Sequence, residues 1–210
     1  MSIRAEGKGK ALLRTEMRAR LQELSDKERV EAGQAIARHL ANFLRDQELG
    51  EEGGTVAFFA NLPFEIATSP LDEMLQGLGI QRILPSVEGR TLMFRRLPLE
   101  VASAELPRDR MGIPTPPGNL SKASPAHCRL LILPGLAFDR LGGRLGQGGG
   151  FYDRLLADIR GRASPGPVTV GIGFDLQLVR RVPMDARDQF IDAVCTPGEG
   201  VVYSRSGGQQ

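Results

Sequence analysis

The chain has 210 residues, of which 41% are hydrophobic and 25% are charged, and its formal net charge is +2. This composition is typical of a globular protein with a sizeable core, and so small a net charge does not indicate a nucleic-acid partner. The two cysteines and two histidines are too few for a disulfide framework, a zinc site or a histidine-based triad. Without a signal peptide or an apolar run of about 18 residues, we expect a cytoplasmic protein that has no membrane partner.

Apolar residues at helical spacing predict a pair of helices at the start of the chain. The first reaches Leu24, and Ser25 with Glu28 forms a capping box that begins the second. The pattern then predicts a strand over 55–60, a helix from Ser69, and two strands over 80–87 and 90–97 that form a hairpin.

The second half of the chain alternates strands and helices. Residues 98–128 form a long, proline-rich connection that is a candidate to line a site. Elements are then expected in the order strand, helix, strand, strand, over residues 129–133, 151–159, 168–174 and 193–196. We therefore expect an α/β fold, a three-layer α/β/α sandwich with a mostly parallel sheet and an N-terminal helical pair. It should form a single domain over 1–203, followed by a disordered tail over 204–210.

A glycine-rich loop over residues 142–150 separates an apolar strand from the helix expected at Phe151. Glycines let backbone N–H groups close on a bound anion, and the positive end of the helix dipole adds to the attraction, so the loop is a candidate phosphate site. It is not a Walker A sequence, because no Lys-Ser or Lys-Thr pair follows Gly148, and its G-x-G-x-G spacing is a poor dinucleotide fingerprint. A flexible hairpin is the alternative interpretation.

Positive charge that could bind a phosphate lies in two places. Arg144 is inside the loop, while Lys10, Arg14 and Arg18 fall four residues apart on one face of the first helix. Like charges at this spacing repel by about 0.2 to 0.5 kcal/mol per pair, and a bound polyanion would reverse that cost. A solvated helix surface is the alternative for this face.

The residues after the loop also allow two interpretations. Asp153 can favour the first turn of its helix through the helix dipole, or it can bind Mg²⁺ together with Asp192 and phosphate oxygens. Phe151 and Tyr152 either join the core or stack on a flat ligand ring.

These residues resemble the 5-formyltetrahydrofolate cyclo-ligase family, also called methenyltetrahydrofolate synthetases. The family pattern P-G-x-x-F-D-x-x-G-x-R-L-G-x-G-x-G-[YF]-Y-D is matched in full between Pro134 and Asp153. Lys10 and Arg14 match an N-terminal K-x-x-x-R segment, residues 59–68 resemble a segment that brings a folate-contacting glutamate to Glu65, and Asp192 matches a late aspartate.

The resemblance implies an enzyme that converts 5-formyltetrahydrofolate to 5,10-methenyltetrahydrofolate, using ATP as co-substrate and Mg²⁺ as cofactor and releasing ADP and phosphate. It implies catalytic roles for Arg144 and Tyr152 and metal binding by Asp153 and Asp192. The implied ATP-binding residues are Lys10, Arg14, Arg144, Leu145, Gly146, Gln147, Gly148, Gly149, Gly150, Phe151 and Tyr152. The implied substrate-binding residues are Ala60, Glu65, Gln147, Gly148, Gly149, Gly150 and Phe151. The partners would be reduced folate and ATP, without nucleic acid, and the protein would be a monomer.

One segment departs from the family pattern. Relatives often carry an aromatic residue followed by G-I-x-E-P, whereas this chain has Met111 followed by G-I-P-T-P, with Thr115 at the position of the glutamate. Two alternatives follow: an ATP-dependent paralogue that acts on another N-formyl metabolite, or a protein that binds folate or nucleotide without turnover.

Overall fold

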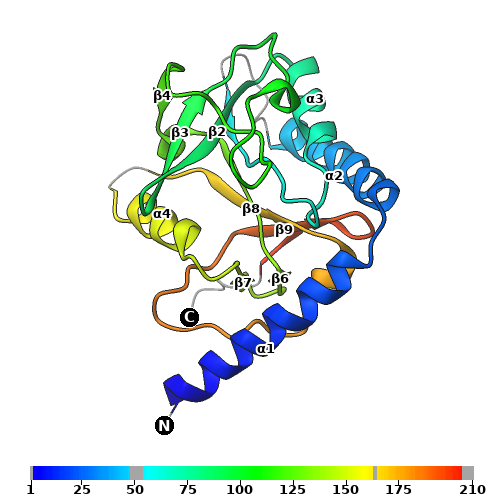
Figure 1. The fold of residues 1–210 in the computed structure, drawn as a ribbon, viewed down its shortest axis with the longest axis vertical. Coiled ribbons are helices and arrows are strands. Elements are labelled where there is room, and N and C mark those ends of the chain that lie inside the picture. The colour runs from blue at the N-terminus through cyan, green and yellow to red at the C-terminus, as the bar shows by residue number, and fades with distance from the viewer. Residues whose placement is uncertain (1, 48–53, 163–164, 205–210) are drawn as a thin grey trace.

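The computed structural model describes residues 2–47, 54–162 and 165–204, and Figure 1 shows their arrangement. The helices are α1 (Ser2–Gln22), α2 (Asp26–Asp46), α3 (Ser69–Gly77) and α4 (Phe151–Arg160). The sheet runs in the order β10 (Gly200–Tyr203), β9 (Ala193–Thr196), β8 (Val168–Ile172), β5 (Leu130–Leu133), β1 (Thr55–Ala57), β2 (Gln81–Glu88), β3 (Thr91–Arg96) and β4 (Lys122–Ala123). Strands β9, β8, β5, β1 and β2 are parallel, and β10, β3 and β4 pair antiparallel at the two edges.

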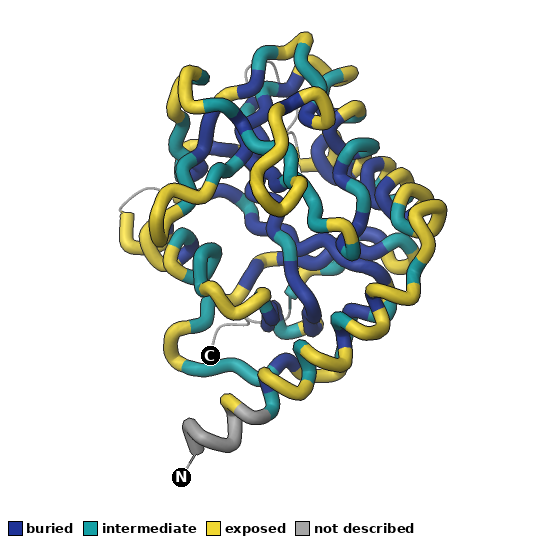
Figure 2. The backbone as a smooth tube through the Cα atoms, viewed as in Figure 1, coloured by how far each residue is buried: buried dark blue, intermediate teal, exposed yellow. Residues whose placement is uncertain are grey.

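Helices cover both faces of this sheet. Along β5, Leu130 and Ile132 belong to a core cluster that also contains side chains of α1, α2 and α3. Leu131 and Leu133 point to the other face and belong to a second cluster with Leu156 and Ile159 of α4. Figure 1 shows α2 and α3 on one side of the sheet and α4 on the other, and Figure 2 shows the buried strands between them. The predicted three-layer α/β/α sandwich with its N-terminal helical pair is confirmed.

Most helices and strands begin and end close to the positions predicted from capping and turn residues in the sequence. The Ser25 side chain accepts from the Glu28 N–H while the Glu28 carboxylate accepts from the Ser25 N–H, so the predicted capping box begins α2. The predicted hairpin between 80–87 and 90–97 is confirmed as β2 and β3, and Gly89 in its turn has a φ of 63°.

Short pieces of structure escape the sequence pattern. A hairpin of β6 (Ala137–Phe138) and β7 (Arg144–Leu145) includes the first part of the glycine-rich stretch 142–150, so that the loop itself is confined to residues 146–150. The 3₁₀ helices η1 (Ser103–Glu105), η2 (Pro125–His127) and η3 (Asp175–Gln177) lie in connections. The edge strands β4 and β10 were also not predicted. Ser204 donates its N–H to the Asp192 carbonyl, and the rest of the predicted tail, 205–210, lies outside the described residues.

Candidate active site

A cleft of about 1040 Å³ opens at the carboxyl ends of the parallel strands. Phe59 follows β1, Val87 lies near the end of β2, and Pro134 follows β5, so three strand ends contribute to its walls. The glycine loop, the start of α4, the start of α1 and residues 185–189 complete the lining. Ligand sites in α/β proteins form at this edge, because the loops that leave parallel strands converge there.

The glycine loop presents backbone rather than side chains. Gly148 has a φ of 107° and Gly150 a φ of 65°, both in the left-handed region that residues with a Cβ avoid. A Cβ at Gly149 would lie 2.8 Å from the Phe151 ring. Gly150 is the N-cap of α4 and has no side-chain capping bond, so the first N–H groups of the helix are open to a ligand at this end.

Arg144 is the central cation of the cleft, and its side chain is only 2% exposed. Its guanidinium donates to the Pro134 carbonyl at 3.1 Å and forms an ion pair with the Asp153 carboxylate at 3.0 Å. It also lies over the Tyr152 ring, 5.7 Å from the ring centroid. Its Nε has no hydrogen-bond partner among the described residues and is enclosed by protein.

The basic face of α1 is directed at this cleft. Lys10 forms ion pairs with Asp185, at 2.7 Å, and with Asp188, and all three residues line the cleft. Further along the helix, Arg14 donates its Nε to the Gly146 carbonyl at 2.9 Å, and Arg18 donates to both the side chain and the carbonyl of Gln147. The hydrogen bond from Lys10 lowers the pKa of Asp185 to about 2, with help from the Arg187 N–H.

Burial shifts the pKa values of two acidic groups that line the cleft. Burial raises the pKa of Glu65 to about 7, and the Leu62 N–H and a hydrogen bond from Gln147 oppose the rise only in part. Burial, together with the nearby Glu65 carboxylate, also raises the pKa of Tyr152 above its ordinary value. The phenol of Tyr152 therefore stays protonated near neutral pH and can donate a hydrogen bond.

The sequence model of the 5-formyltetrahydrofolate cyclo-ligase family matches residues 6–197. The chain belongs to this family.

Cyclo-ligases that match the chain include the 5-formyltetrahydrofolate cyclo-ligase of Escherichia coli (strain K12), which is 35% identical over 151 residues, or 69% of this chain and 79% of that protein. The enzyme of that name from Haemophilus influenzae is 26% identical over 84% of this chain and 91% of its own length. Among solved structures, the 5,10-methenyltetrahydrofolate synthetase of Aquifex aeolicus has a TM-score of 0.74 at 27% identity, and it covers 96% of this chain and 95% of its own. The chain is accordingly an enzyme, a cyclo-ligase.

The structure of this cyclo-ligase brings nearly all of the predicted site residues to the one cleft. They come from α1, from the segment after β1, and from the run of β7, the glycine loop and the first turn of α4. Those that line the cleft are Lys10, Arg14, Ala60, Glu65, Arg144, Leu145, Gly146, Gln147, Gly148, Gly149, Gly150, Phe151, Tyr152 and Asp153.

Asp192 is the exception, and the prediction that it lies beside Asp153 is wrong. It precedes β9, at the amino ends of the parallel strands, where it borders a separate hollow. Its carboxylate accepts from the N–H and the hydroxyl of Thr169, at 2.8 and 2.6 Å. Asp192 therefore joins β8 to β9 at the edge of the sheet opposite the cleft.

Asp188 lies where a second carboxylate was expected. It lines the cleft and binds Lys10, and the N–H of the next residue, Gln189, donates to the Asp153 carboxylate at 3.3 Å. Its sequence signal was its position in the connection after β8, a strand whose carboxyl end reaches the cleft. Across the described residues, no group of three or more His, Cys, Asp or Glu side chains is arranged to hold a metal ion.

The motif that contains the glycine loop also includes a residue with a structural role, Asp139. Asp139 is 1% exposed, and its carboxylate accepts from the N–H groups of Leu141, Gly143 and Val182. The bonds to Leu141 and Gly143 fix the turn between β6 and β7, directly before Arg144, and the bond to Val182 ties this turn to the connection after β8. Within the described part of the chain, no helix is long and apolar enough to span a membrane.

Proposed function

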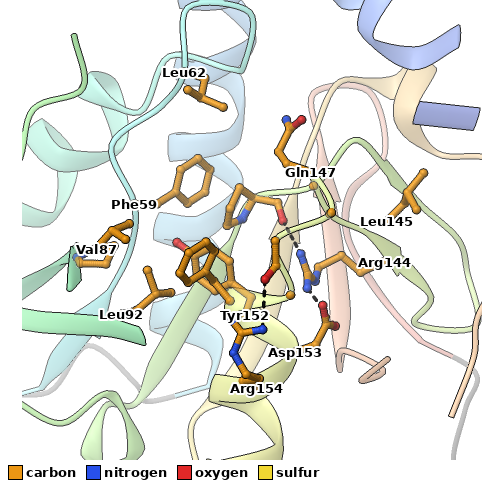
Figure 3. A pocket seen from close by; sticks show the side chains of 18 of the residues that line it. Phe59, Leu62, Val87, Leu92, Arg144, Leu145, Gln147, Tyr152, Asp153 and Arg154 are labelled. Atoms are coloured by element: carbon orange, nitrogen blue, oxygen red, sulfur yellow. Dashed lines mark hydrogen bonds and ion pairs between the residues drawn. The ribbon is translucent and has the colours of Figure 1, made fainter. Parts of the chain in front are cut away.

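We propose that the chain catalyses the ATP- and Mg²⁺-dependent cyclisation of 5-formyltetrahydrofolate to 5,10-methenyltetrahydrofolate, with release of ADP and phosphate. The observation that carries the proposal is the arrangement of the cleft. The cleft is lined by a glycine-rich backbone loop and a buried arginine and also by apolar side chains and a buried carboxyl group. Figure 3 shows Arg144 on one side and Phe59, Leu62 and Leu92 on the other. One end suits a phosphate chain, and the other suits a flat ring with polar edges.

ATP phosphates would lie against the glycine loop and the start of α4. Lys10, Arg14 and Arg144 supply positive charge around this loop, and the bonds of Arg144 to Pro134 and Asp153 fix its guanidinium at the cleft, which supports a role in holding the transferred phosphoryl group. Because charge develops on that group during transfer, fixed donors there lower the barrier without having to reorganise.

Magnesium fits the carboxylates of the cleft. Mg²⁺ takes oxygen ligands, keeps several waters and needs only one or two carboxylates in addition to phosphate oxygens. Asp153 and Asp188 would hold it, because both line the cleft. Gln189, the residue after Asp188, donates its N–H to the Asp153 carboxylate, and this bond ties the two segments together. The bound ion would neutralise phosphate charge during transfer.

The reduced folate would lie along the apolar wall formed by Phe59, Leu62 and Leu92, three residues labelled in Figure 3. The Glu65 carboxylate can accept two N–H bonds from the amino-pyrimidinone edge of the pterin. The protonated Tyr152, whose pKa responds to Glu65 and Arg144, would donate near the formyl group.

In the proposed reaction the formyl oxygen attacks the γ-phosphorus and ADP leaves. Nitrogen 10 of the folate attacks the carbon of the resulting iminium phosphate and closes the five-membered ring. Loss of the N10 proton to solvent and departure of phosphate then give the conjugated methenyl product. The chain contributes position and charge: the glycine loop and Arg144 bind the phosphoryl group, and Glu65 orients the ring so that the two reacting ends meet.

The experiment that tests the proposal follows near-ultraviolet absorbance of the purified protein with 5-formyltetrahydrofolate and MgATP, because the methenyl product has an extended conjugated chromophore. A rise that needs both ATP and magnesium is expected. ATP binding without a rise would contradict the proposed substrate, and a panel of other N-formyl compounds would then be tested. The position of Met111 and Thr115 on the cleft makes that panel worthwhile.

The role of Arg144 can be tested separately. Arg144→Ala should lower turnover by roughly 10²- to 10³-fold, because it removes a fixed donor from the phosphoryl site. Arg140→Ala is the matched control: Arg140 lies in the same motif, but its side chain is 50% exposed and pairs with Glu199. Circular dichroism should show both variants folded. Full activity in folded Arg144→Ala would remove the assigned role.

A further inference from the structure

Arg154 is a cation at the cleft to which no role has been given above. It projects from the first turns of α4, and its side chain is exposed, so the core does not depend on it. Its guanidinium nevertheless makes three separate contacts, all with backbone or side chains that line the cleft. Figure 3 shows it directly below the glycine loop.

The first contact fixes a peptide plane of the loop. Arg154 donates through one terminal nitrogen to the Gly149 carbonyl at 3.0 Å. In a trans peptide the carbonyl and the following N–H point in opposite directions. Holding the Gly149 carbonyl against the guanidinium therefore turns the Gly150 N–H away from it and prevents this peptide from flipping.

The second contact joins the loop to the opposite wall. The other terminal nitrogen of Arg154 donates at 2.9 Å to the carbonyl of Arg90, in the turn between β2 and β3. The planar guanidinium thus bridges the glycine loop and the hairpin turn, two segments about 60 residues apart in the chain, through a fork of fixed geometry.

The third contact positions the aromatic residue that begins α4. The guanidinium lies over the Phe151 ring, 5.1 Å from the centroid, and this ring is itself close to Gly149. A Cβ at Gly150 would lie 2.9 Å from a terminal nitrogen of Arg154, so glycine at this position also leaves room for the bridge.

We propose that Arg154 is a positioning residue that bridges the glycine loop to the β2–β3 turn and so holds the loop in its phosphate-binding form. The inference rests on the proposed function, since the loop that Arg154 positions is the proposed phosphate site. Arg14 and Arg18 hold the carbonyls of Gly146 and Gln147 from the side of α1. Arg154 does the same for Gly149 from the side of α4.

The test compares Arg154→Ala and Arg154→Lys with the control Arg162→Ala. Lysine keeps the charge but cannot reproduce a planar fork that reaches two carbonyls. Arg162 follows the same helix, is 48% exposed and pairs with Asp158. Two quantities are measured: amide hydrogen exchange of residues 146–152 and 88–92 without substrates, and steady-state kinetics with MgATP and 5-formyltetrahydrofolate varied in turn.

Both Arg154 variants should show several-fold faster exchange in the two segments, while the control exchanges as the wild type does. Both should lose about 10- to 100-fold in kcat/KM for ATP and less for the folate, because a misplaced loop acts mainly on the phosphates. Wild-type exchange rates and kinetics in Arg154→Lys would overturn the proposal, because a positive charge without the planar fork would then be enough to hold the loop. Weaker ATP kinetics with unchanged exchange would also overturn it, by indicating direct contact with ATP. A wild-type chain without turnover would contradict the proposed function, whereas the exchange data test the bridge alone.

Discussion

At the scale of single residues, the buried carboxyl group of Glu65 has the clearest consequence for activity. Its pKa is raised to about 7 from an ordinary value of 4.5, chiefly by burial. Between these two values the folded chain holds a proton that the unfolded chain has lost. The contribution of Glu65 to the stability of the fold therefore falls as the pH rises from 4.5 to about 7. Only above about pH 7 is its side chain mainly the carboxylate that could accept hydrogen bonds from a pterin edge.

We expect kcat/KM for 5-formyltetrahydrofolate to rise with pH through an apparent pKa near 7. Glu65→Gln should abolish this rise and lower kcat/KM by about 10- to 100-fold at pH 8, because the amide offers only one acceptor oxygen. The same variant should unfold at higher denaturant concentration than the wild type at pH 8, since no buried carboxylate remains. An unchanged pH profile in Glu65→Gln would assign the titration to another group.

At the scale of elements, α1 connects two parts of the cleft. Met17 and Leu21 bury one face of the helix, while Lys10, Arg14 and Arg18 hold residues 185–188 and the glycine loop. The carboxylates and carbonyls that these cations bind offset the repulsion between like charges on the helix. The helix thus holds the segments that form the proposed phosphate end of the cleft.

Lys10→Met should lower kcat/KM for ATP by about 10- to 100-fold, because it removes a phosphate-side cation and leaves Asp185 and Asp188 without their shared partner. The measurement is steady-state kinetics with ATP varied. Lys27→Met is the control, since Lys27 is 82% exposed on α2 and forms only a weak surface pair with Glu31. Equal values for the two variants would contradict a role of Lys10 in ATP binding.

The same scale shows what the sequence could predict. Helices α1 to α4 and most strands were predictable, because apolar periodicity and caps are local signals. Strands β4, β6 and β7 have two residues each, too few to form a pattern. Asp192 was assigned to the metal because it precedes the last predicted strand and matches a late aspartate of the family pattern, whereas Asp188 lies four positions earlier in the chain. Which of them reaches the cleft depends on where β9 begins, and pairing with β8 decides that.

At the scale of the whole molecule, a buried ion pair attaches the long 98–128 segment to the sheet. The Arg82 side chain is 0% exposed and bonds to Asp72 at 2.6 Å, and its other nitrogen donates to the carbonyls of Pro98, Leu99 and Val101. The second oxygen of Asp72 accepts the Ser103 N–H. The residues that follow, 109–115, can therefore form one rim of the cleft from a fixed starting point.

Asp72→Ala should lower the free energy of unfolding by about 3 to 5 kcal/mol, because it leaves a buried guanidinium without its counter-charge. Urea unfolding measures the change, and Glu73→Ala, at the exposed neighbouring position, should alter stability by no more than about 0.5 kcal/mol. A loss below about 1 kcal/mol for Asp72→Ala would contradict the structural role of the pair.

The bare backbone of the glycine loop has an evolutionary consequence. The proposed recognition of a phosphate by main-chain N–H groups is hard to tune by exchanging side chains, because Gly148 and Gly150 have backbone conformations that favour glycine. The apolar wall of Phe59, Leu62 and Leu92 and the rim formed by residues 109–115 line the cleft with side chains. Single substitutions can therefore change their shape and polarity. In the proposed enzyme, the site of the phosphate donor would therefore be constrained by its backbone, while the side chains that contact the phosphate acceptor would remain open to change by selection.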